Sequence, residues 1–220
     1  MRINKWIAVN APYSRRGADR LIEEGRVTVN GIKAITGQEV TDADAISIDG
    51  KSVIVRSIKT TVLLLNKPVG YVCSRDGQGA PTIYKLIPTK FHHLDIAGRL
   101  DKDSSGLVLI TNDGELLHQL THPSFAKEKR YEVRLNKPLS PKDAQRIAEG
   151  VRIDDYTSKL NILQLSSEGL NWQVLMHEGR NRQIRRTFEM LGYKVEGLNR
   201  TNIGSYSIKD IQTSQYLQVL

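Results

Sequence analysis

The sequence contains a run of four consecutive apolar residues, Val62–Leu65 (VLLL), whose burial limits the folds open to the chain. A strand with one exposed face alternates apolar and polar side chains, whereas a continuous apolar run is typical of a strand covered on both faces. Pro68 and Gly70 follow closely and end the segment. We therefore predict a strand in this position that is buried on both faces.

Three further strands and three helices are predicted beyond this run. Apolar and β-branched residues predict strands at 107–111, 130–135 and 171–176, and helical periodicity predicts helices at 114–120, 140–150 and 181–192. The elements interleave without a regular strand–helix–strand rhythm. We therefore predict an α+β domain with a mixed or antiparallel sheet over residues 62–220.

The first fifty residues have a different pattern and predict a small separate domain. Ile3, Trp6 and Ile7 have helical spacing, Ser14 is placed to cap a second helix, and Gly25 is placed to end it. The dipeptides Asn30-Gly31 and Asp49-Gly50 then favour two tight hairpin turns. The predicted order is helix, helix, β-ribbon over residues 1–48, with a short polar linker at 49–61.

The charge balance favours a polyanionic partner. The chain has 32 Lys and Arg against 24 Asp and Glu, which gives a net charge of +8. Five of these cations lie in the two N-terminal helices: Arg2, Lys5, Arg15, Arg16 and Arg20. They could contact phosphates together, although a solvated helix face explains the charges about equally well.

Composition disfavours several other classes of site. The single cysteine, Cys73, excludes an internal disulfide and suits a reducing compartment. The histidines lack zinc-ligand spacing, and we expect neither a metal nor another cofactor. No apolar run approaches the roughly 20 residues of a membrane helix, and the N-terminus is too polar for a signal peptide. We expect a cytoplasmic monomer without membrane association.

The segment GRLDKDSSGLVLITNDG, residues 98–114, places an acid in a loop before a predicted strand. Asp101 follows Arg99 closely, and a carboxylate on a loop braced by strands is well placed for chemistry. The spacing alone leaves a simpler interpretation open, because most loop aspartates are solvated or cap a turn.

The segment EKRYEVRL, residues 128–135, presents Tyr131 on one face of a predicted strand. The ring could pack into a core, or it could provide a flat surface on which a base stacks. Strand periodicity does not decide between these two roles.

Arginines concentrate where the last predicted helix begins, in HEGRNRQIRRTFEMLG. Asn181 is placed to begin this helix, and cations at a helix N-terminus oppose the macrodipole. A locally unfavourable arrangement of this kind indicates function, and arginine suits the binding of carboxylate or phosphate. The residues concerned are Arg180, Arg182, Arg185 and Arg186.

Together these segments resemble the bacterial ribosomal RNA pseudouridine synthases of the RsuA/RluB/RluF type. The resemblance rests on LNKPVGYVCS, GRLDKDSSGLVLITNDG, THPS, EKRYEV, EGRNRQIRR and LNRTNIG, which occur in that order. The first 48 residues resemble the RNA-binding domain named after ribosomal protein S4. The resemblance implies an enzyme that isomerises a specific uridine in ribosomal RNA to pseudouridine, without a cofactor.

The resemblance also implies roles for individual residues. Asp101 would be the catalytic carboxylate, with Arg185 as the cation that favours its ionised form. Tyr131 would stack on the target uracil, and Arg99 would fill the gap left by the flipped uridine. Ile203 would form an apolar wall of the pocket. Which step Asp101 performs first is left open by the sequence.

RNA contacts outside the pocket are expected from the basic residues of both parts of the chain. They comprise Arg99, Arg2, Lys5, Arg15, Arg16, Arg20, Arg180, Asn181, Arg182 and Arg186. The expected partner is small- or large-subunit ribosomal RNA, or an assembly intermediate. The alternatives are a non-catalytic ribosome-assembly factor and a synthase that acts on another structured RNA such as transfer RNA.

Overall fold

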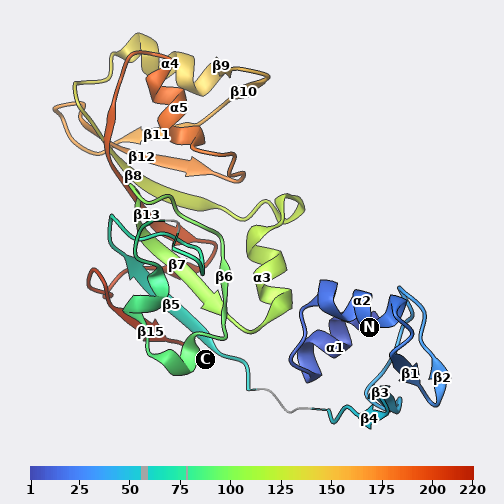
Figure 1. The fold of residues 1–220 in the computed structure, drawn as a ribbon. Coiled ribbons are helices and arrows are strands. Elements are labelled where there is room, and N and C mark those ends of the chain that lie inside the picture. Colours follow the sequence, from blue (N-terminus) through green and yellow to red (C-terminus); the bar gives the residue numbers. More distant parts are fainter. Residues whose placement is uncertain (56–58, 78) are drawn as a thin grey trace. The chain divides into compact units, whose positions relative to one another are not determined.

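The computed structural model describes residues 1–55, 59–77 and 79–220 (Figure 1). Contacts divide the chain into two compact units, Met1–Lys59 and Thr60–Leu220. The domain boundaries predicted above remain a prediction, and residues 56–58 of the predicted linker lie outside the described residues. The structure extends the sheet of the first unit into this linker, because strand β4 (Lys51–Ser52) pairs with β3 (Ile46–Ile48).

Two helices form one layer of the first unit, as predicted. Helix α1 spans Ile3–Asn10 and helix α2 spans Arg15–Glu23. The Ser14 hydroxyl accepts a hydrogen bond from the Gly17 amide at 3.0 Å, so it caps α2. Trp6 and Leu21 are buried in the apolar cluster between the helices and the ribbon.

The ribbon of the first unit is a four-stranded antiparallel sheet in the order β2-β1-β3-β4. Its first two strands are β1 (Val27–Val29) and β2 (Ile32–Lys33). Asn30 and Gly31 have φ values of 52° and 84°, and Asp49 and Gly50 have values of 51° and 75°. Two successive positive φ angles are characteristic of a type I′ turn, which confirms both predicted hairpins.

A nine-stranded mixed sheet organises the described residues of the second unit (Figure 1). Seven strands follow the order β11-β12-β8-β13-β7-β5-β15, β6 pairs with β7, and β14 pairs with β13. The bounds are β5 Val62–Lys67, β6 Asp95–Ala97, β7 Ser105–Thr111, β8 Lys129–Leu135, β11 Asn161–Gln164, β12 Asn171–Met176, β13 Val195–Ile203, β14 Tyr206–Ser207 and β15 Tyr216–Gln218. The pair β13–β7 is parallel and the other pairs are antiparallel, so the predicted α+β class with a mixed sheet is confirmed.

Strand β5 is buried along its whole length, as the apolar run predicts. Leu63 and Leu65 pack into a core cluster on one face, and Val62 and Leu64 pack into a second cluster on the other. The alternation of strand side chains explains why both faces require apolar residues.

Helices lie beside the sheet at its edges and ends. The bounds are α3 Gly114–Thr121, α4 Pro141–Glu149 and α5 Gln183–Glu189, with 3-10 turns η1 Ile83–Leu86, η2 Thr89–Phe91 and η3 Pro123–Phe125. A separate hairpin, β9 (Val151–Ile153) with β10 (Tyr156–Ser158), follows α4. Helix α5 begins at Gln183, two residues after the predicted start, because Arg182 has a left-handed backbone with φ 49°. Every helix in the described ranges is too short or too polar to span a bilayer.

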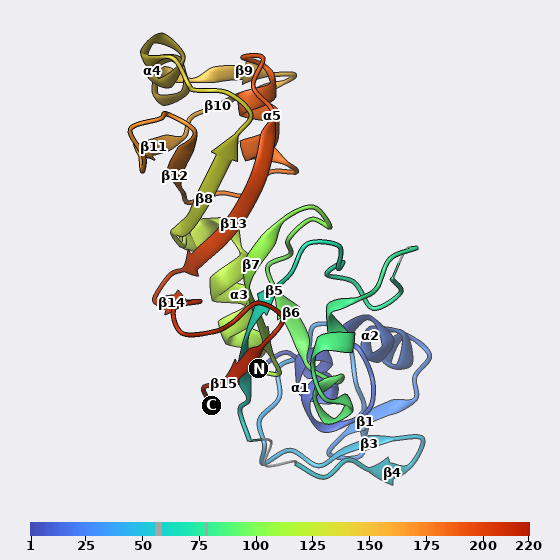
Figure 2. The same ribbon diagram turned by 90° about the vertical axis from the view of Figure 1, so that its left-hand side faces the viewer.

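The two halves of the large sheet meet where β7 runs parallel to β13. Ser105 pairs with Asn199, and Gly106 pairs with Arg200. Figure 2 shows β8 and β13 side by side on one side of this junction. Gly106 has φ +107°, and a Cβ atom there would lie 2.3 Å from the carbonyl oxygen of Arg200. The close backbone approach therefore requires glycine.

We predict that Gly106→Ala destabilises the second unit more than Gly204→Ala does. Gly204 also has a positive φ, but the nearest atom to its added Cβ would be 3.9 Å away. The Gly204 change should cost about 1 kcal/mol of backbone strain, whereas the Gly106 change adds a clash with a neighbouring strand. Denaturant unfolding measures both, and equal shifts in the two midpoints would contradict the close approach.

Candidate active site

A cavity of about 950 Å³ opens in the second unit. Its lining comes from the loop before β7, from strands β8 and β13, and from the loop before α5. Six of the predicted site residues line it together: Arg99, Asp101, Tyr131, Arg180, Asn181 and Arg182. The volume lies in the range of sites that enclose a small ligand or one nucleotide.

The loop that contains Asp101 is held in place by a buried arginine of β13, Arg200. Arg200 is 2% exposed. Its guanidinium donates to the carbonyl oxygens of Leu107 at 2.8 Å, Gly98 at 3.1 Å and Arg99 at 3.5 Å. Because Arg200 also pairs with Tyr131 across β13 and β8, one residue connects the Asp101 loop to the tyrosine.

Three further hydrogen bonds fix the same loop. The Ser104 amide donates to the Asp101 carbonyl at 3.1 Å, which closes a turn. The Gly70 amide donates to the Lys102 carbonyl at 2.7 Å, and the Leu100 amide donates to the Cys73 sulfur at 3.4 Å. The position of the Asp101 backbone is therefore set by the loop itself and by the segment that follows β5.

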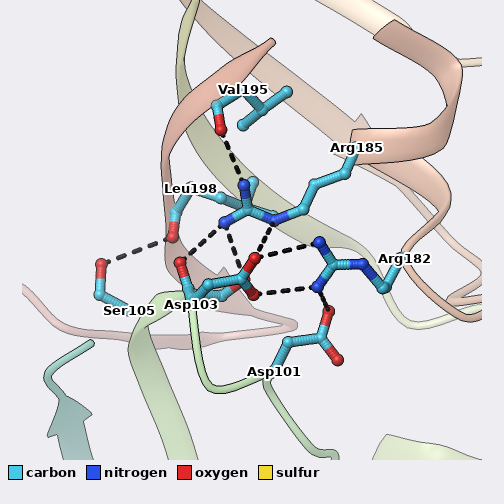
Figure 3. Close-up of polar contacts among 8 residues, drawn as sticks. Asp101, Asp103, Ser105, Arg182, Arg185, Val195 and Leu198 are labelled. Carbon is cyan, nitrogen blue, oxygen red and sulfur yellow. Dashed lines mark hydrogen bonds and ion pairs between the residues drawn. The ribbon is translucent and has the colours of Figure 1, made fainter. Parts of the chain in front are cut away.

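Two arginines from the start of α5 meet two carboxylates of this loop (Figure 3). Arg182 donates to both carboxylate oxygens of Asp103, at 3.1 and 3.0 Å, and lies 3.6 Å from the Asp101 carboxylate. Arg185 donates to the Asp103 carbonyl at 2.7 Å and to the Val195 carbonyl at 2.8 Å. These carboxylates offset the unfavourable placement of cations at the helix N-terminus.

The ion pair of Asp101 differs from the one that the family resemblance implies. We expected Arg185 beside Asp101, but the structure gives this contact to Arg182. Arg185 instead has its Nε atom 3.3 Å from the Asp103 carboxylate. Figure 3 shows the Asp103 side chain between Arg185 and Asp101, so the direct contact of Arg185 is with Asp103.

Asp103 is ionised at neutral pH in this arrangement. Partial burial raises the pKa of its carboxyl group, but the Arg182 hydrogen bonds and the charge of Arg185 outweigh it, so the net pKa is lowered. The Asp103 carboxylate in turn raises the pKa of Arg182. Two arginines, Arg182 and Arg185, therefore hold the negative charge of Asp103.

Tyr131 and Lys129 lie on the same face of β8 and line the cavity. Tyr131 is 7% exposed and packs into the core cluster. The Tyr131 ring thus belongs both to the core and to the cavity wall. Burial and the nearby Arg200 lower the pKa of the Lys129 amine.

Three predicted site residues of the second unit are not among the described residues that line this cavity: Arg185, Arg186 and Ile203. Ile203 was expected to form an apolar pocket wall, but it is 1% exposed and packs with Leu107 and Leu120 in a core cluster. It is not among the described residues that line the cavity. Arg186 likewise points elsewhere and forms an ion pair with Asp154 in the β9–β10 turn.

The basic residues of the first unit lie mostly at its surface. Arg2, Arg15, Arg16 and Arg20 are exposed, and Lys5 is half-buried. Arg16 and Arg20 are four residues apart on α2 and therefore share one face of the helix.

Sequence reasoning missed three residues that shape the site. Asp103 and Arg200 carry the contacts described above, and Lys67 is a fully buried lysine at the end of β5. Burial lowers the pKa of the Lys67 amine, while Cys73 and the Asp103 carboxylate act in the opposite direction. For Lys67 and Arg200 the only sequence signal is a charged residue inside a strand, and Asp103 is one of several charged residues in a loop, so neither pattern reveals the partner.

This geometry agrees with the comparisons with known proteins. Residues 61–190 match the family described as RNA pseudouridylate synthase, and residues 1–46 match the S4 domain family. The chain belongs to the RNA pseudouridylate synthase family.

Curated relatives match nearly the whole chain. It is 37% identical over 213 residues to ribosomal large subunit pseudouridine synthase B of Pseudomonas aeruginosa, covering 92% of this chain and 55% of that protein. It is 36% identical over 217 residues to ribosomal small subunit pseudouridine synthase A of Pasteurella multocida, covering 96% and 91%. It is 34% identical over 217 residues to dual-specificity RNA pseudouridine synthase RluF of Escherichia coli, covering 98% and 74%.

The match to the large-subunit synthases is partial on their side. The chain spans about half the length of these relatives, 55% for the protein from Pseudomonas aeruginosa and 44% for that from Xanthomonas campestris.

A solved structure described as pseudouridylate synthase superposes with a TM-score of 0.71 at 31% identity, covering 100% of this chain and 96% of that one. This pseudouridylate synthase fold therefore includes both units of the chain.

We predict that Arg200→Met lowers the free energy of unfolding by about 3 kcal/mol or more, because three carbonyl acceptors lose a buried charged donor. Arg134→Met serves as the control, since Arg134 lies on the neighbouring strand β8 and its side chain is 66% exposed. Denaturant unfolding should show a large shift for the first variant and a small one for the second. Equal shifts would contradict the structural role of Arg200.

Proposed function

We propose that the chain converts a uridine of ribosomal RNA to pseudouridine in the cavity that holds Asp101. The observation that carries this proposal is the placement of the Asp101 carboxylate beside Arg182 in a nucleotide-sized cavity whose wall includes Tyr131. Membership in the family supports the class of reaction, and the names of the relatives support ribosomal RNA as the substrate.

The proposed reaction rearranges bonds within one nucleotide. The bond between uracil N1 and ribose C1′ breaks, the ring turns, and C5 becomes bonded to C1′. C5 loses a proton and N1 gains one, so the composition of the nucleotide does not change. A carboxylate that acts as nucleophile or base at the sugar or the ring is enough to start this sequence.

The site residues divide this work by position. Arg182 places a positive charge 3.6 Å from the Asp101 carboxylate. Arg185 acts indirectly, because it binds the carbonyl and the carboxylate of Asp103 and so helps to fix the loop that contains Asp101. Tyr131 offers a rigid ring in the cavity wall against which a uracil can stack.

A uridine must leave its base stack to reach a carboxylate inside a cavity. Arg99 is exposed at the rim, where its side chain can take the place of the extruded base. Lys102, Arg180 and Arg182 also line the opening and supply positive charge for the flanking phosphates. Selection of one uridine would then come from RNA shape and from unpaired bases near the opening.

The first unit would add affinity for structured RNA. Its S4 domain carries the exposed Arg15, Arg16 and Arg20 on one short helix. Phosphate contacts of this kind hold the RNA backbone and discriminate little between sequences. We propose that this unit grips the RNA while the second unit performs the chemistry.

We predict that Asp101→Asn abolishes tritium release from RNA that carries uridine tritiated at C5, because C5 loses its hydrogen only when the new bond forms. Asp95→Asn is the matched control, since Asp95 is exposed and pairs with Arg75 away from the cavity lining. Small- and large-subunit ribosomal RNAs are assayed separately, so release from one of them names the substrate. RNA binding without release by the unaltered protein would favour a non-catalytic assembly factor.

We predict that Arg16→Ala combined with Arg20→Ala weakens RNA binding without lowering kcat. The slope of log affinity against log salt concentration should fall by about 0.7–0.9 for each phosphate that the variant no longer neutralises. Arg26→Ala is the control, because Arg26 is occupied by ion pairs with Glu24 and Asp49. A salt slope unchanged by the double substitution would contradict the RNA-binding role assigned to α2.

A further inference from the structure

The hairpin of β9 and β10 places an aromatic ring next to the arginine-rich loop that precedes α5. Figure 1 shows this hairpin beside α5, and hydrogen bonds join the two elements. Ser158 of β10 accepts hydrogen bonds from Gln183 at 3.2 Å and from Thr187 at 2.8 Å. All three side chains are buried, so the hairpin and the start of α5 form one packed body.

Tyr156, the first residue of β10, supports an arginine at the cavity opening. The guanidinium carbon of Arg180 lies 4.3 Å from the centre of the Tyr156 ring, within the range of a cation–π contact. Arg186 lies over the same ring at 6.0 Å and is anchored by its ion pair with Asp154. Of these residues, Arg180 lines the cavity.

The Tyr156 hydroxyl has no hydrogen-bond partner within the described ranges, although it is buried. A buried hydroxyl without a partner contributes nothing to stability and carries a desolvation cost. The contact with Arg180 therefore depends on the ring and not on the hydroxyl group.

The Arg180 guanidinium also forms an ion pair with Glu178. Its Nε atom lies 3.6 Å from the Glu178 carboxylate, and Glu178 accepts a hydrogen bond from Gln183 at 2.6 Å. The Gln183 side-chain oxygen in turn accepts from the Arg180 amide at 3.2 Å. Among the residues that the structure describes, the two terminal nitrogens of Arg180 have no hydrogen-bond acceptor, and the side chain is 52% exposed.

We propose that Tyr156 is a positioning residue that holds the Arg180 guanidinium at the cavity opening, so that its terminal nitrogens bind a phosphate of the RNA strand entering the site. This inference rests on the proposed function for the identity of the ligand. A stacked guanidinium keeps its N–H edge available for a bidentate contact with an oxyanion. The ring also restricts the rotamers of Arg180 before RNA binds, which reduces the entropic cost of binding.

Four variants test this role: Tyr156→Phe, Tyr156→Leu, Arg180→Ala and the double variant Tyr156→Leu/Arg180→Ala. RNA binding is measured by filter binding to whichever unmodified ribosomal RNA the unaltered protein binds more tightly, and KM and kcat are measured by tritium release. Tyr156→Phe keeps the ring and removes only the hydroxyl without a partner, so it should bind within two-fold of the unaltered protein. Tyr156→Leu and Arg180→Ala should each weaken binding and raise KM by about three- to ten-fold with kcat unchanged.

The double variant decides whether the two residues act together. If Tyr156 acts through Arg180, the double variant binds no more weakly than Arg180→Ala alone. Additive losses, equal losses for the Phe and Leu variants, or a fall in kcat without a rise in KM would each overturn the proposal. Absence of tritium release by the unaltered protein would refute the proposed function, while the binding ratios would still test Tyr156.

Discussion

The site depends on one buried guanidinium, that of Arg200. Its hydrogen bonds to Gly98, Arg99 and Leu107 fix the loop before β7 from inside the domain. A buried charge requires this full set of acceptors, since desolvation without them is costly. Because Gly106 allows β7 and β13 to approach closely, the same junction joins the two halves of the sheet and positions Asp101 relative to Tyr131.

Electrostatics within the cavity are arranged around Asp103. This carboxylate binds Arg182 through both oxygens and also meets Arg185, so the start of α5 is attached to the Asp101 loop. Arg182 thereby remains next to Asp101 while most of its hydrogen bonding is directed to Asp103. In the proposed function, Arg99 takes the place of the extruded base and Arg180 binds an RNA phosphate. The β9–β10 hairpin adds further contacts, since Tyr156 lies against Arg180 and Arg186, and Asp154 pairs with Arg186.

Local patterns of the sequence predicted most of the fold. The run at 62–65, the cap at Ser14 and the Asn-Gly turn each act over a few residues, and the structure confirms them. The order of strands and the parallel pair β13–β7 depend on contacts far apart in the chain, and no local pattern encodes them. The candidate site divides in the same way. Motif resemblance indicated Asp101, Tyr131 and the arginines, and the structure gathers most of them around one cavity. The resemblance could not show that Arg185 contacts Asp103 and not Asp101, or that Ile203 belongs to the core. Both depend on side-chain geometry.

The most direct test of this account is a crystal structure of the Asp101→Asn variant bound to the ribosomal RNA that the unaltered protein modifies. The account predicts one uridine out of its base stack, with its uracil ring against Tyr131 and its C1′ atom near the substituted side chain. It also predicts Arg99 in the gap left in the RNA and a phosphate at Arg180. RNA bound elsewhere, with every uridine stacked and the cavity empty, would contradict the assignment of the active site.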